Sequence, residues 1–211
     1  MGCGSTDASP EGDQGETAEE LTTGTSYVTL RPDVRRCVSP LCGGYWVERV
    51  NQTTTRCSDG AYHAACYVAE VDLSRLGLTE EQENALLNDT PVVFRASIRS
   101  KTFGSFGNLG QLHATEAWKA TAAGHSTGSF YRVFDSGIRC IRAPCPFERA
   151  SKLNSSVSRT ITGVDLANAP GSDSEKETAL GEAATKTGLV VAGTIKGSEL
   201  LGTQFFSRVL P

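Results

Sequence analysis

Two stretches of this chain resemble each other, and the fold has to accommodate both. YVTLRPDVRRCVSPLCGGYWVERVN (27–51) and YRVFDSGIRCIRAPCPFERASKLN (131–154) both begin with Tyr, pass through an Arg-Cys pair and a second Cys, and end on Asn. In each stretch four residues that include a Pro separate the cysteines, and a Glu-Arg pair follows, Glu48-Arg49 in one and Glu148-Arg149 in the other. An ordered similarity of this kind indicates an internal repeat.

The similarity continues towards the C-terminus. Val71-Asp72-Leu73 is matched by Val164-Asp165-Leu166, and ATEAWKA (114–120) lies over GTQFFSR (202–208). The sequence therefore predicts a tandem duplication, with repeat 1 over 26–120, a linker over 121–128 and repeat 2 over 129–211. We expect the two repeats to pack as one domain about a pseudo-twofold axis.

Each repeat is predicted to be a β-β-β-α-β-β unit. Thr79 and Gln82 form a predicted capping box at the start of the helix of repeat 1, and Ser172 or Asp173 begins the helix of repeat 2. GSFGNLG (104–110) predicts a hairpin turn. The fold class is therefore α+β and rich in β-structure. The apolar and β-branched runs predict strands at 27–30, 45–50, 65–73, 91–99 and 110–118 in repeat 1, and at 131–134, 157–166, 188–195 and 201–209 in repeat 2.

Six of the seven cysteines lie within the repeats. Repeat 2 has only Cys140 and Cys145, which correspond to Cys37 and Cys42 of repeat 1. Between the shared Asn and the shared Val-Asp-Leu there are 19 residues in repeat 1 and 9 in repeat 2, so Cys57 and Cys66 belong to an insertion. The simplest pairing is local and gives the disulfides Cys37–Cys42, Cys57–Cys66 and Cys140–Cys145. Such a chain suits an oxidising compartment.

Three other functions remain open for CIRAPCP (140–146). A zinc site is disfavoured because repeat 2 has one cysteine pair with no adjacent His. A redox pair is disfavoured because such pairs are CxxC motifs at a helix N-terminus. The stretch is also compatible with the reactive loop of a protease inhibitor that presents Arg142, although the corresponding loop of repeat 1 has no Arg at this place. The prevailing hypothesis is a disulfide that holds a turn, with Arg142 in a contact loop.

The N-terminal 25 residues differ from the rest in composition. They carry six acidic residues and no Lys or Arg, whereas the remaining 186 residues carry 20 bases and 18 acids. A segment this poor in apolar residues is predicted to be a disordered tether (1–25). MGCGSTDASPEGDQGE looks like the region around the lipidation site of a bacterial lipoprotein, with Cys3 as the lipidated residue. The alternatives are myristoylation of Gly2 with palmitoylation of Cys3, and an unmodified chain end.

The motifs RPDVRRCVSPLCGGYWVERVN, CYVAEVDLSRLGL, TEAWKA and GIRCIRAPCP resemble those of an uncharacterised domain-of-unknown-function family of bacterial, myxobacterial-type secreted proteins and lipoproteins. The resemblance covers about residues 26–211. It implies an envelope or secreted location, and it brings no catalytic residues, cofactor or metal with it. Because the hydrophobic segment that precedes such a lipidated cysteine is not in this sequence, we expect a truncated or late start.

The sequence contains no P-loop, GxGxxG or HExxH motif, so we predict no catalytic residue, cofactor or metal site. His63, His113 and His125 are interpreted as surface or structural residues, and Glu116 and the Glu-Arg pairs as solvated strand faces. The N-x-[ST] matches at Asn51, Asn88 and Asn154 are expected by chance in a chain rich in Ser and Thr. The near-neutral charge of residues 26–211 argues against a nucleic-acid partner.

The leading hypothesis is a non-enzymatic binding or structural lipoprotein of the bacterial cell envelope, periplasmic or on the surface, or else a secreted protein. Its expected partners are a membrane, through the lipid on Cys3, and a protein. The alternatives are a protease inhibitor that acts through the Cys140–Cys145 loop and an envelope hydrolase that gathers Glu116, a His and a nucleophile.

Overall fold

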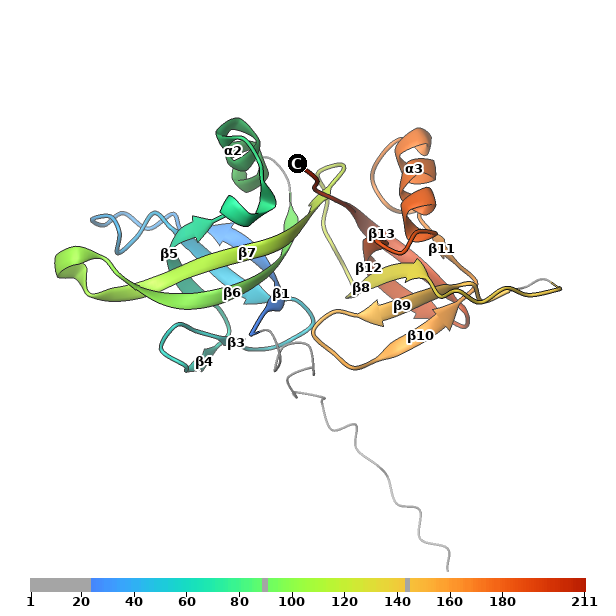
Figure 1. Cartoon of the computed structure of the whole chain (residues 1–211), viewed down its shortest axis with the longest axis horizontal. Coiled ribbons are helices and arrows are strands. Elements are labelled where there is room, and N and C mark those ends of the chain that lie inside the picture. The colour runs from blue at the N-terminus through green and yellow to red at the C-terminus, as the bar shows by residue number, and fades with distance from the viewer. Residues whose placement is uncertain (1–23, 89–90, 143–144) are drawn as a thin grey trace, which may run out of the picture.

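The computed structural model describes residues 24–88, 91–142 and 145–211. Cys3 and all but the end of the predicted tether (1–25) lie outside these residues. The chain forms two groups of strands that lie side by side, each with one helix on the same side of the molecule (Figure 1). The first group contains β1 (Ser26–Pro32), β2 (Tyr45–Arg49), β3 (Thr55–Arg56), β4 (Tyr62–His63), β5 (Cys66–Asp72), η1 (Ser74–Leu76), α2 (Glu80–Asn88), β6 (Val92–Thr102), η2 (Gly104–Phe106) and β7 (Asn108–Ala120). The second contains β8 (Ser129–Asp135), β9 (Glu148–Lys152), β10 (Ser158–Ile161), β11 (Gly163–Asp165), α3 (Asp173–Ala183), β12 (Leu189–Lys196) and β13 (Glu199–Arg208).

The first group closes into a barrel. β1 pairs with β2 and with β6, β2 pairs with β5, and β6 pairs with β7, all antiparallel. β5 and β7 are parallel neighbours, and their pairing completes the ring. Val28, Val47, Val68, Phe94 and Leu112 fill the interior because every second residue of a strand points to the same face. We call this unit barrel 1.

The second group has the same pairings. β8 pairs with β9 and β12, β9 pairs with β10, and β12 pairs with β13. The predicted strand over 157–166 is broken at Thr162 into β10 and β11, and β11 closes the ring by its parallel pairing with β13. Val133, Ile161, Leu189, Leu200 and Phe205 lie in its core. We call this unit barrel 2.

A five-stranded ring in the order 1-2-3-5-4-1, with a helix between the third and fourth strands, is the connectivity of the oligonucleotide- and oligosaccharide-binding (OB) fold. The chain is thus β-rich with two α-helices among the described residues. Both helices begin with a capping box, the one at Thr79 as predicted and the one at Ser172 where only a cap was predicted. The hydroxyl of Thr79 accepts from the Gln82 amide while Gln82 accepts from the Thr79 amide, and Ser172 and Glu175 form the same reciprocal pair. Leu86 of α2 packs into the core of barrel 1.

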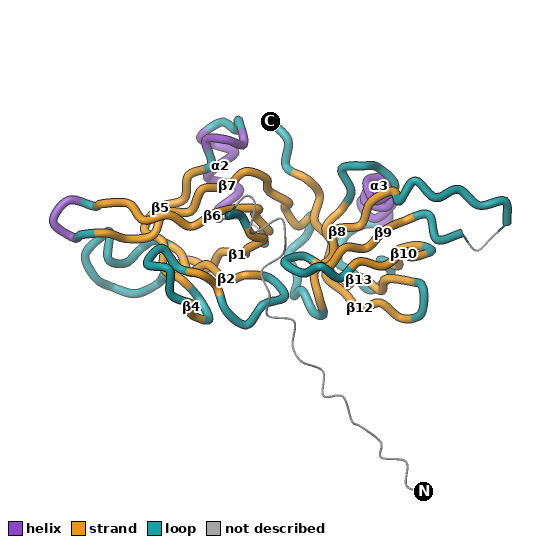
Figure 2. Tube along the Cα trace, turned by 60° about the horizontal axis from the view of Figure 1, so that its bottom comes forward, coloured by secondary structure: helices purple, strands orange, loops and turns teal. Residues whose placement is uncertain are grey.

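The three predicted disulfides are present. Cys37–Cys42 and Cys140–Cys145 each close the loop between the first and second strands of a barrel. Cys57–Cys66 ties the β3–β4 hairpin, which is the insertion of the first half, to β5. The β1–β2 loop and the β8–β9 loop point away from the centre of the molecule. One of them therefore lies near each end (Figure 2). Cysteine spacing alone therefore predicted the covalent framework correctly.

The two barrels meet through the ends of their last strands. Lys119 pairs with Ser207, flanked by Trp118 with Arg208 and by Ala120 with Phe206. Around this ladder lies a mixed apolar cluster that is drawn from both barrels. The Tyr27 ring packs 5.6 Å from Trp118, and the Phe130 ring packs 5.9 Å from Phe206. Trp118 is completely buried in this junction.

Two asparagines link the barrels reciprocally. Asn154 of barrel 2 accepts from the Tyr27 amide at 2.8 Å and donates to the carbonyls of Tyr27 and Val50 at 2.7 and 2.9 Å. Asn51 of barrel 1 accepts from the Phe130 amide at 2.8 Å and donates to the carbonyls of Phe130 and Leu153 at 2.8 and 2.9 Å. Both have a positive φ, 61° at Asn51 and 54° at Asn154. We call the six hydrogen bonds the asparagine clamp.

The clamp corrects the sequence alignment. Tyr27 corresponds to Phe130 and not to Tyr131, and Glu148 corresponds to Tyr45, because the offset between the halves is constant from Cys37–Cys140 to Asn51–Asn154. The Glu-Arg pairs are therefore not equivalent. Glu48 is exposed, whereas Glu148 is buried and its Oε2 atom has no hydrogen-bond partner among the described residues.

Replacing Asn154 is expected to destabilise the whole chain. Asn154→Ala removes three hydrogen bonds from buried backbone groups and leaves a β-carbon in the left-handed region, so we expect a loss of about 3 kcal/mol. Asn154→Gly tolerates the backbone and should lose about 1 kcal/mol less than the Ala variant. Urea unfolding measures both, with the exposed helix variant Asn84→Ala as the control. Wild-type stability in both Asn154 variants would contradict the role of the clamp.

Burial raises the pKa of Glu148 above the ordinary value of 4.5. The folded state then binds the proton more tightly than the unfolded state, so stability falls as the pH rises from 4 towards 7. Glu148→Gln removes this dependence, and its stability relative to wild type should increase over that range. Urea midpoints at a series of pH values test this. The exposed Glu48→Gln is the matched control, and parallel pH profiles for wild type and Glu148→Gln would refute the prediction.

Candidate functional site

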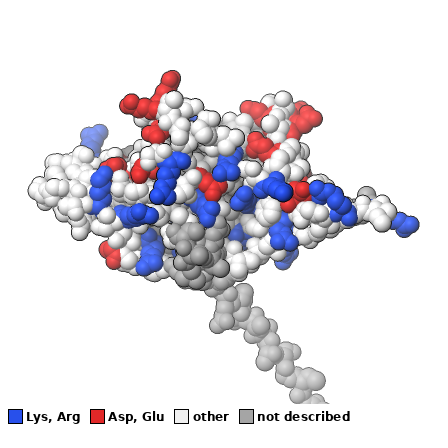
Figure 3. Space-filling model, in the orientation of Figure 1, with Lys and Arg blue, Asp and Glu red and all other residues white. Residues whose placement is uncertain are grey.

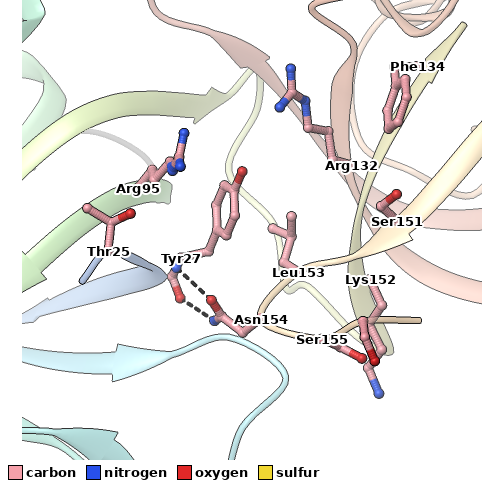
Figure 4. A pocket seen from close by; sticks show the side chains of 11 residues that line it. Thr25, Tyr27, Arg95, Arg132, Phe134, Ser151, Lys152, Leu153, Asn154 and Ser155 are labelled. Atoms are coloured by element: carbon pink, nitrogen blue, oxygen red, sulfur yellow. Dashed lines mark hydrogen bonds between the residues drawn. The ribbon is translucent and has the colours of Figure 1, made fainter. Parts of the chain in front are cut away.

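A cleft of about 370 Å³ lies where the two barrels meet. Its walls come from both, with Tyr27 of β1 and Arg95 of β6 on one side and Arg132 of β8 and Lys152 of β9 on the other (Figure 4). The Tyr27 ring stands between the two arginines, and Asn154 lies at the base with its clamp to the Tyr27 backbone. The volume falls within the usual range of ligand sites, about 300–1,000 Å³. The cleft exists because the clamp fixes the barrels against each other.

The charged residues that line the cleft, among those described, are all basic. Arg95, Arg132 and Lys152 line it, and among the described residues no Asp or Glu does. In the view of Figure 3, Lys and Arg lie across the middle of the molecule, whereas Asp and Glu gather on the two helices. Cations that share a partly desolvated cleft attract an anion more strongly than single surface charges do. The cleft therefore favours a negatively charged ligand.

The two arginines of the cleft are held in different ways. The Arg95 side chain is mostly buried and donates to Glu116 at 2.9 Å, and the same carboxylate receives Arg208 at 3.1 Å. One carboxylate thus serves two guanidinium groups. Arg132 donates through Nε and Nη2 to the Thr187 carbonyl, at 3.0 and 2.9 Å. A carbonyl orients the guanidinium without neutralising its charge.

Polar neutral groups complete the wall. Ser151, at the end of β9, and Ser155 and Ser156, in the turn that follows, lie beside Lys152. The Ser155 hydroxyl accepts from the Val157 amide, and Ser151 donates to Ser158, so these hydroxyls are oriented by the turn itself. Hydroxyls and guanidinium groups together provide hydrogen bonds for the oxygens of a carboxylate, phosphate or sulfate group.

The structure places the sequence-predicted residues away from this cleft. Arg142 is exposed on the cysteine loop near the far end of barrel 2, next to Ile141, which is fully exposed. At the base of that loop the Arg139 guanidinium, at 2.8 Å, holds the pKa of Asp135 below its usual range. The role of the Cys140–Cys145 loop as a contact loop stays a prediction, because residues 143–144 within it lie outside the described residues.

The groups that a hydrolase would need are engaged separately. Glu116 is bound to Arg95 and Arg208, and His113 hydrogen-bonds Asp72 at 2.9 Å. His63 lies on β4, and His125 lies between the barrels in sequence, after β7. Within the described ranges, no three His, Cys, Asp or Glu side chains are placed so that they could hold a metal ion. None of the helices in those ranges has the length and apolar character needed to cross a membrane.

Sequence reasoning missed the cleft because its residues are scattered. Arg95, Arg132 and Lys152 form no motif and come from three strands. The one usable signal was the shared asparagine at the end of each repeated stretch, which was interpreted as a chance N-x-[ST] match at Asn51 and Asn154.

Comparison with protein families gives one match. The family described as Domain of unknown function (DUF6748) matches residues 26–210. The chain belongs to this family. The match begins at the first residue of β1 and ends two residues after β13, so the DUF6748 domain comprises both barrels and the junction between them. No curated protein matches the chain, and no solved structure matches it.

Proposed function

We propose that this DUF6748 domain is a binding module for the cell envelope or the extracellular space, and that its inter-barrel cleft takes a small ligand bearing a carboxylate, phosphate or sulfate group. The observation that carries the proposal is the cleft lined by Arg95, Arg132 and Lys152, with no acidic lining residue among those described. Guanidinium groups recognise such oxyanions by paired hydrogen bonds. The domain's role is capture and not chemical conversion.

The location is part of the same proposal. Three disulfides fit a secreted or extracellular protein, since cytosolic thiols are kept reduced. A lipid on Cys3 would tether the domain to a bacterial membrane through the acidic segment. Finding the six paired cysteines as reactive thiols in protein isolated from its envelope would contradict this location.

We also propose that the two barrels arose by tandem duplication of one unit and are related by a pseudo-twofold axis, with repeats over 26–120 and 129–211. The equivalent strand pairings support this, as does the ladder centred on Lys119 and Ser207, which occupy corresponding positions. The two halves of the asparagine clamp correspond bond for bond. If one barrel was the ancestral unit, we expect the isolated segment 24–120 to fold detectably. Failure of this segment to fold would argue against this origin.

Anion binding is tested by titrating the disulfide-intact protein with pyrophosphate and with citrate in a calorimeter at low ionic strength. Removing one charge-assisted hydrogen bond costs about 1.5–3 kcal/mol, so Arg132→Gln and Lys152→Gln should each weaken binding by about tenfold or more. Added salt should weaken it as well. Arg99→Gln is the matched control, because Arg99 is exposed further along β6, outside the cleft.

Two results would overturn the anion proposal. One is the absence of saturable binding of either anion to wild type. The other is unchanged affinity in the double variant Arg132→Gln/Lys152→Gln, which would place the anions elsewhere on the protein.

A further inference from the structure

Barrel 1 carries a second concave surface, on the outer face of β2 and β5. Trp46 and Tyr67 are direct cross-strand neighbours there, with ring centroids 5.6 Å apart. Both rings are partly exposed, and both line a hollow of about 600 Å³ that is closed on one side by the β3–β4 hairpin. The hollow is separate from the inter-barrel cleft and shares no lining residue with it.

The two rings form a rigid wall. Arg35 lies over both, 4.9 Å from the Trp46 ring and 5.2 Å from the Tyr67 ring. Asp33 is buried and fixes Arg35 through hydrogen bonds of 2.8 to 3.0 Å, which lower the pKa of Asp33 to about 2. The charge of Arg35 is therefore compensated from within the protein, and the guanidinium supports the rings from the side of the Cys37–Cys42 loop.

The polar atoms of both rings are already bound. Trp46 donates its indole N–H to Asp33 at 3.3 Å. The Tyr67 hydroxyl donates to the Pro40 carbonyl at 2.7 Å and accepts from the Gly44 amide at 3.3 Å. Because these groups are satisfied within the protein, the rings offer carbon surface to the hollow. A wall of this kind suits the apolar C–H face of a ring-shaped ligand.

The rim of the hollow carries neutral and acidic hydrogen-bonding groups. Ser58, Asp59 and His63 come from the hairpin, and Asn108 comes from the start of β7. Asn108 accepts from the Thr102 hydroxyl through its carbonyl oxygen, so its amide N–H groups point to other partners. Among the described lining residues there is no Lys or Arg, in contrast to the cleft. This rim suits hydroxyl groups and does not select an anion.

Gly110, which lines the hollow, allows two strands to pack closely there. A β-carbon at Gly110 would lie 2.6 Å from the Tyr67 carbonyl oxygen, so β7 can approach β5 only without a side chain at this position. The face of the second and third strands, beside the loop that joins strands 1 and 2, is also where OB-type barrels commonly hold ligands.

We propose that this hollow binds a neutral saccharide, with one sugar ring stacked on Trp46 and Tyr67 and its hydroxyls bonded to Asp59, His63 and Asn108. A sugar ring combines an apolar C–H face with peripheral hydroxyls, as the wall and rim require. Barrel 2 lacks both parts, since Arg149 and Thr160 stand opposite each other at the positions of Trp46 and Tyr67, and the disulfide-tied hairpin is missing. The aromatic pair and the inserted hairpin thus occur together in one barrel.

The test uses tryptophan fluorescence of the full disulfide-bonded chain with maltohexaose, cellohexaose and chitohexaose. The protein has two tryptophans, and Trp118 is fully buried, so quenching by acrylamide reports on Trp46. We expect at least one hexasaccharide to protect Trp46 saturably. Trp46→Ala, followed by calorimetry with the same sugar, should weaken binding tenfold or more. Arg149→Ala, at the corresponding position of barrel 2, should leave it unchanged.

A second variant covers the case in which Trp46→Ala fails to fold. His63→Ala/Asn108→Ala changes two exposed rim residues and should weaken binding at least fivefold while the tryptophan emission of the variant stays that of the folded protein. No saturable protection by any of the three sugars in wild type would overturn the proposal. Unchanged affinity in the rim variant would overturn it as well. Pyrophosphate binding is measured on the same proteins, and it should not change in either variant.

Discussion

Six hydrogen bonds from two asparagine side chains fix the two barrels of this protein to each other. Asn51 and Asn154 each use a complete amide, one acceptor and two donated N–H groups, on backbone groups of the opposite barrel at the junction. Their positive φ values are tolerated because Asn adopts the left-handed region more readily than most residues. The clamp satisfies buried backbone groups that would otherwise oppose the contact.

The binding surfaces follow from this arrangement. The cleft needs Arg95 from one barrel and Arg132 and Lys152 from the other, so neither barrel alone could form it. The aromatic hollow is built within barrel 1, but it depends on the Cys37–Cys42 loop for Asp33 and Arg35 and on the Cys57–Cys66 hairpin for its rim. Two of the disulfides thus hold loops that border this surface, and the proposed ligands of the two sites differ in charge.

Local patterns in the sequence were sufficient to predict the cysteine pairs, the capping box at Thr79, the start of the second helix at Ser172 or Asp173, the hairpin after β6 and most strands. These features depend on residues close together in the chain, and their chemistry is visible in a short window. The closure of each barrel was not predictable in this way, because it rests on parallel pairings such as β5 with β7, which join residues about forty positions apart. The alignment of Glu48-Arg49 with Glu148-Arg149 was wrong, because the structure places Glu48 at the surface and Glu148 inside barrel 2.

Amide hydrogen exchange at Tyr27 and Phe130 tests the central claim most directly. Each amide is donated to an asparagine of the opposite barrel, so its exchange reports on the junction and not on its own strand ladder. If the clamp makes the two barrels one cooperative unit, both amides exchange as slowly as those of the core strands, and both lose protection in Asn51→Gly/Asn154→Gly. Exchange at the rate of an unprotected amide in the wild-type protein would contradict the account.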